Sequence, residues 1–147
     1  LGAALGGHVE LARGRDGVLV AAEGLENALS VAALGHAPGA TLWAALTAAG
    51  LAALRLPRPP GHLIIAPDID RNKQAAGQRA AFRLGRRAQA QGWTVQVLVG
   101  LQPDQDFNDA LVAGTAGQLH LVDLTEFANM MKAIKAELTA KDKVGAD

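Results

Sequence analysis

The feature that most constrains the fold is a series of short apolar runs that alternate with helical patterns. Four of these runs are predicted as strands, over residues 18–22, 41–46, 63–66 and 94–99. Uninterrupted apolar runs are typical of strands that are buried on both faces of a sheet. Strands that alternate with helices favour right-handed crossovers and a parallel arrangement. The pattern therefore predicts an α/β domain whose parallel sheet is covered by helices on both faces.

Helical spacing of apolar residues fills the gaps between the strands. A short helix is expected over 47–54, where a proline cluster ends it, and a long one from about Ala75 to Gln91. Another short helix is expected over 107–112, and an amphipathic helix with a frayed end near the C-terminus. We expect a lead-in segment from a preceding module (1–16), one domain (17–113) and a C-terminal extension (114–147).

Composition excludes several classes of function. The chain of 147 residues has no Cys, which excludes disulfides, thiolate zinc sites and thiol nucleophiles. Its 14 basic residues balance its 14 acidic ones, so a polyanion has to be held by a local patch. The longest apolar run, about 14 residues over 41–54, is shorter than the ~20 that cross a bilayer. We expect a cytoplasmic location and no membrane partner.

Acidic residues follow three of the predicted strands. Glu23 comes after the first strand, Asp68 and Asp70 after the third, and Asp106 and Asp109 after the fourth. Parallel sheets bind ligands beyond the carboxyl ends of their strands, so we expect five carboxylates on one rim. Each close pair costs about 4 kcal/mol at roughly 4 Å and an effective dielectric near 20, which favours a bound cation. Carboxylates without His or Cys select Mg²⁺, Mn²⁺ or Ca²⁺, and Mg²⁺ in turn favours a phosphodiester or nucleotide substrate.

A basic stripe is predicted on the long helix that follows the Asp68–Asp70 segment. At about 100° per residue, four arginines fall within roughly a third of the helix circumference. They are Arg79, Arg83, Arg86 and Arg87. Such a stripe suits the backbone of a nucleic acid.

Each of these features also has a purely structural interpretation. Asp68 or Asp70 is suited to capping the helix that follows, and Glu23 to pairing with an arginine. Asp106 and Asp109 are more typical of an N-cap and a first-turn acid than of a ligand site. An arginine stripe is more often the solvated face of an amphipathic helix.

Three segments together resemble the Toprim domain, which is shared by bacterial-type primases, type IA and II topoisomerases, and certain nucleases and recombination mediators. They are Val18–Gly24, Asp68–Asp70 and Asp106–Asp109. The likeness is strongest to the Toprim domains of phage and mobile-element primases, whose first motif is similar to Glu23–Ser30 here. It covers about residues 17–113, most of the chain.

The resemblance implies a compact, Rossmann-like domain with a four-stranded parallel sheet that synthesises primers. Glu23 would match the family's general acid/base or metal organiser, and Asp68 and Asp70 its ligands for Mg²⁺ (or Mn²⁺). Asp106 and Asp109 would match a late acidic motif. The implied partners are nucleotide triphosphates, single-stranded DNA or an RNA–DNA heteroduplex, and zinc-binding or helicase modules of the same parent protein. The chain departs from the pattern at Asn27, where many primases carry an acidic residue.

Other functions remain open on the sequence alone. A Toprim nuclease would cut phosphodiesters, and a non-catalytic Toprim module would organise protein and DNA without turnover. A topoisomerase needs a tyrosine nucleophile, and the chain has no Tyr. A phospho-acceptor signalling domain would carry a pair of acidic residues after the first strand and a Lys after the fourth. Here no Lys lies between Lys73 and Lys132.

Overall fold

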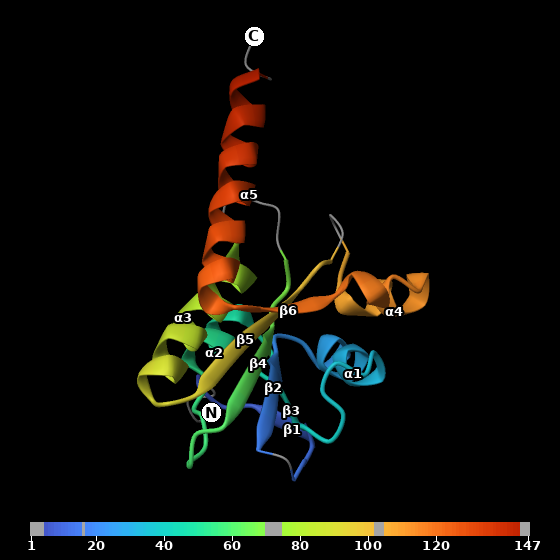
Figure 1. The fold of residues 1–147 in the computed structure, drawn as a ribbon, viewed down its shortest axis with the longest axis vertical. Helices are drawn as coiled ribbons and strands as arrows, with labels where there is room; N and C mark the ends of the chain where they lie inside the picture. The colour runs from blue at the N-terminus through green and yellow to red at the C-terminus, as the bar shows by residue number, and fades with distance from the viewer. Residues whose placement is uncertain (1–4, 16, 70–74, 102–104, 145–147) are drawn as a thin grey trace.

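The computed structural model describes residues 5–15, 17–69, 75–101 and 105–144. It is an α/β fold in which a mixed sheet of six strands is flanked by helices (Figure 1). The strands are β1 (Val9–Ala12), β2 (Val18–Ala22), β3 (Thr41–Ala44), β4 (His62–Ala66), β5 (Thr94–Val99) and β6 (His120–Asp123). The helices are α1 (Leu25–Ala33), α2 (Ala48–Ala53), α3 (Ala76–Ala90), α4 (Phe107–Ala113) and α5 (Leu124–Val144), with a 3₁₀ turn at Ala116–Gln118.

The four predicted strands form the parallel centre of the sheet. They lie side by side in the order β3-β2-β4-β5, so the predicted α/β class is confirmed. The sheet is wider than predicted, because β1 pairs antiparallel with β3 and β6 pairs antiparallel with β5. These two edge strands are four residues long and partly exposed, so they lack the apolar run that marks a strand buried on both faces. The division into a lead-in segment (1–16), a domain (17–113) and a C-terminal extension (114–147) stays a prediction.

Alternation along the central strands divides the core into two layers. On one face, Leu63, Ile65 and Val97 pack against α2, α3 and the beginning of α5. On the other face, Val20 and Ile64 pack against α1 and α4. Figure 1 shows α1 and α4 together on one side of the sheet and α2 and α3 on the other. Both faces are therefore covered, which is why the central strands are apolar throughout.

The lead-in residues are fixed to the sheet by polar contacts as well as by strand pairing. Trp43 donates its indole N–H to Glu10 Oε2 at 3.1 Å, and Arg13 Nε lies 2.9 Å from Glu10 Oε1. The His8 ring stacks on Trp43 with 3.5 Å between centroids. The hydrogen bonds from Arg13 and Trp43 hold the pKa of Glu10 below its usual range, while desolvation lowers the pKa of His8.

Helix α5 begins against α3 and then extends away from the sheet (Figure 1). Leu124 and Phe127, in its first turns, are buried, and most later side chains that the structure describes are exposed. None of the helices formed by the described residues is both long and apolar enough to cross a membrane.

Candidate metal centre

Two of the predicted acidic residues follow neighbouring strands at the same edge of the sheet. Ala22, the last residue of β2, pairs with Ala66, the last residue of β4. Glu23 follows β2 directly, and Asp68 follows β4 after one intervening proline. Because the two strands are parallel, both acidic residues lie at the carboxyl edge, where open α/β sheets bind ligands.

Gly77, in the first turn of α3, brings that helix against both acidic residues. A Cβ built on Gly77 would lie 2.3 Å from the backbone oxygen of Asp68 and 3.2 Å from Glu23 Oε2. Only a residue without a side chain allows this approach. The N-terminal end of α3, which carries a partial positive charge, therefore lies beside the Glu23 carboxylate.

A third residue, Asn27, completes the cluster. It lies in the first turns of α1, is only 7% exposed, and donates its side-chain amide to Asp68 Oδ1. The sequence identified Asn27 only as a departure from the family pattern. Asn27 lies three residues after Gly24, the N-cap of α1, and its contact with Asp68 spans 41 positions of the chain, so no local sequence pattern signals it.

The donor set fits a hard divalent cation. Glu23 Oε2 is buried and Asp68 is half-buried, so both carboxylates are partly removed from water. Mg²⁺ characteristically binds through one or two carboxylates, with waters and substrate phosphates in its remaining positions. Within the part of the chain that the structure describes, no group of three or more His, Asp or Glu could hold a metal ion. Asp70, the other expected ligand, lies outside the described residues.

Asp106 and Asp109 bind each other's backbone N–H at the beginning of α4. Asp106 Oδ1 accepts the backbone N–H of Asp109 at 2.8 Å, and Asp109 Oδ2 accepts that of Asp106 at 3.0 Å. This reciprocal pair is a capping box at the beginning of α4, and both residues are exposed. The structure thus shows this pair in a helix-capping role, and its predicted role as a second acidic motif stays a prediction.

Removal of this cap separates the structural role from metal binding. Asp106→Ala is expected to lower the free energy of unfolding by about 1 kcal/mol, whereas Asp106→Asn, an equally good N-cap, leaves it nearly unchanged. Urea denaturation measures both. Mn²⁺ affinity, measured by calorimetry, should be the same in wild type and both variants. A loss of Mn²⁺ affinity in Asp106→Asn would return this pair to the metal site.

The predicted arginine stripe divides in two. Arg79, Arg83 and Arg86 are exposed, and the Arg86 guanidinium lies 5.9 Å from the centroid of the Phe82 ring. Arg87 is half-buried and donates to the carbonyls of Ala52 at 2.7 Å and Leu54 at 2.8 Å. It thus donates to carbonyl groups at the C-terminal end of α2, which have no hydrogen-bond partner within that helix. The structure engages Arg87 within the fold, which leaves three arginines on the solvent face.

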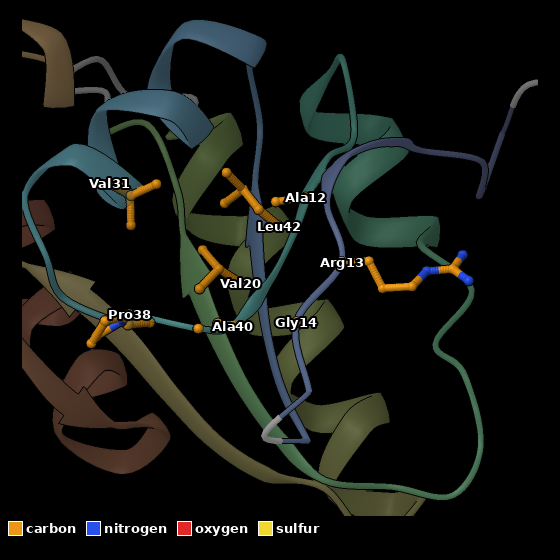
Figure 2. A pocket seen from close by; sticks show the side chains of 11 residues that line it. Ala12, Arg13, Gly14, Val20, Val31, Pro38, Ala40 and Leu42 are labelled. Carbon is orange, nitrogen blue, oxygen red and sulfur yellow. The ribbon is translucent and has the colours of Figure 1, made fainter.

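A hollow of about 280 Å³ lies elsewhere, near the beginning of β3 (Figure 2). Its labelled side chains, among them Val20, Val31 and Leu42, are mostly apolar. Arg13, at its edge, points away from these three side chains in Figure 2 and is paired with Glu10. The residues that line the hollow include no acidic residue, so it is separate from the acidic cluster described above.

Comparison with known families identifies the domain that most of the chain forms. A family model described as Toprim domain matches residues 18–117, which is more than half of the chain and includes both Glu23 and Asp68. No curated protein and no solved structure matches the chain.

Proposed function

The chain belongs to the Toprim family, and from this membership we propose that it is the magnesium-dependent nucleotidyl-transfer domain of a DNA primase-type replication protein of a phage or mobile element. Toprim domains occur in enzymes such as primases and topoisomerases, and they generally bind Mg²⁺. Membership thus supports a metal-dependent role in nucleic-acid processing. The proposal goes further in assigning primer synthesis, with nucleotide triphosphates and a single-stranded DNA template as substrates.

The observation that carries this proposal is the meeting of Glu23, Asp68 and the first turn of α3 at the carboxyl edge of the sheet. We assign Asp68 and Asp70 as the metal ligands, with Glu23 completing the site. A bound Mg²⁺ would neutralise the negative charge that develops on the transferred phosphate. Glu23 Oε2, close to the α3 N-terminus, is the atom that we assign to accept the proton of the primer 3′-hydroxyl.

The exposed arginines of α3 support a nucleic-acid partner. α3 begins beside the acidic pair, and Arg79, Arg83 and Arg86 follow along its solvent face. In the proposal these side chains bind phosphates of the template or of an RNA–DNA heteroduplex, so they contribute affinity without reading sequence. We do not assign this role to Arg87, because its guanidinium donates two hydrogen bonds to α2.

One assay distinguishes primer synthesis from its rivals. A 5′-labelled single-stranded oligonucleotide is incubated with the protein and Mg²⁺ or Mn²⁺, and labelled ribonucleotides are supplied in a parallel reaction. We expect new labelled product only with nucleotides and cation present, and none with Glu23→Gln. Shortening of the oligonucleotide without nucleotides would identify a nuclease instead. The absence of both synthesis and cleavage would identify a non-catalytic module.

A further inference from the structure

The contact between Asn27 and Asp68 joins two segments that lie 41 positions apart in the chain. Asn27 comes from α1 and Asp68 from the segment after β4, so only the folded sheet brings them together. A buried amide is costly unless it is hydrogen-bonded. The Asn27 side chain does not cap α1, whose N-cap residue is Gly24 and has no side-chain cap hydrogen bond. The observed use of the Asn27 amide is therefore its donation to Asp68.

Asp68 is restrained at two points. Gly77 packs against its backbone carbonyl, which fixes the position of the main chain. The Asn27 amide binds its Oδ1, which restricts rotation of the carboxylate. A carboxylate can accept several hydrogen bonds, so donation by one amide is compatible with ligation of a cation.

We propose that Asn27 is a positioning residue that orients the carboxylate of Asp68 for a divalent cation. The inference rests on the proposed function, because it concerns the same metal site. A ligand that is oriented by a neighbouring hydrogen bond binds its metal more tightly than a ligand free to rotate, and loss of such a partner typically weakens binding by about 10–100-fold.

The neutral charge of Asn27 matters as much as its hydrogen bond. An acidic residue at this position would direct a third carboxylate toward Asp68 and Glu23, and the three would repel one another when no cation is present. An amide donates to Asp68 and adds no charge. Asn27 thus orients Asp68 even before a cation binds, so less ordering is required at the moment of binding.

The first test compares the Mn²⁺ affinity of wild type, Asn27→Ala and the control Asn129→Ala, whose residue is exposed on α5. Mn²⁺ binding is followed by electron paramagnetic resonance at a temperature where circular dichroism shows all three to be folded. We expect affinity to fall by about 10–100-fold in Asn27→Ala and to remain unchanged in the control. Wild-type affinity in Asn27→Ala would overturn the inference but not the proposed function. Absence of Mn²⁺ binding in wild type would overturn both.

A second variant decides the question if Asn27→Ala does not fold. Asn27→Leu keeps a branched side chain of similar shape but removes the amide donor, and Asn129→Leu makes the same change at an exposed position. We expect a given concentration of Mn²⁺ to raise the melting temperature of Asn27→Leu less than that of wild type or the control, because weaker binding stabilises the folded state less. A merely structural role predicts the same Mn²⁺-induced rise in all three proteins, and that result would overturn the inference.

Discussion

Replacing Gly77 by alanine is expected to lower the free energy of unfolding by about 1–3 kcal/mol, although alanine normally stabilises a helix relative to glycine by up to ~1 kcal/mol. The reason is the 2.3 Å contact that the new Cβ would make with the backbone oxygen of Asp68. A backbone atom cannot move aside as a flexible side chain does, so α3 or the Asp68 segment has to shift. Because Glu23 Oε2 lies 3.2 Å from the same Cβ, we also expect Mn²⁺ affinity to fall by more than about tenfold.

Gly117 offers a matched control for this substitution. It also belongs to a helical segment, the 3₁₀ turn at Ala116–Gln118, but a Cβ built there meets no atom within 4 Å. Gly117→Ala should leave stability within about 0.5 kcal/mol of wild type and Mn²⁺ affinity unchanged. Urea denaturation and calorimetry measure the two quantities. If Gly77→Ala proves as stable as Gly117→Ala and binds Mn²⁺ equally well, the close approach of α3 to the acidic pair is wrong.

Asp68→Asn is expected to abolish detectable Mn²⁺ binding and to reduce nucleotidyl transfer by about 100-fold or more, because a metal supplies several kcal/mol of charge stabilisation. The substitution preserves shape, so the fold should survive. It also removes one of two neighbouring negative charges, so the variant without cation should be at least as stable as wild type. Loss of activity together with retained or increased stability is the signature of a site kept for function.

Asp123→Asn is the control for the change in net charge. Asp123 is exposed, and its Oδ1 accepts the backbone N–H of Glu126 at 2.8 Å, a role that asparagine also performs. This variant should bind Mn²⁺ and transfer nucleotides as wild type does. Wild-type Mn²⁺ affinity in Asp68→Asn would show that Asp68 is not a ligand.

The centre of the fold was predictable because its strands are buried on both faces. The apolar runs Val18–Ala22 and Leu63–Ala66 identify such strands without knowledge of their neighbours. The edge strands β1 and β6 were not predictable in this way, since each has one side open to solvent and owes its conformation to the strand beside it. Strand pairing at an edge is a tertiary effect, which local apolar patterns do not encode.

In the candidate site, too, some features follow from sequence rules and others depend on tertiary packing. The rule that ligands bind at the carboxyl ends of parallel strands was enough to place Glu23 and Asp68 at one edge. The capping box of Asp106 and Asp109 was visible in the sequence as an alternative, and the geometry favours it. The hydrogen bonds from Arg87 to α2 depend on how the two helices pack, which the local sequence pattern does not predict. Asn27 was also missed, because burial of an amide makes sense only once its partner is known.

Anomalous X-ray scattering from a crystal soaked in Mn²⁺ tests most directly whether Glu23 and Asp68 form a divalent-metal site. We expect an anomalous peak at the carboxyl ends of β2 and β4, within coordination distance of an Asp68 carboxylate oxygen and beside Glu23. An ordered, fully folded crystal without a peak at this edge, or with its peak at the capping pair of α4 instead, would contradict it.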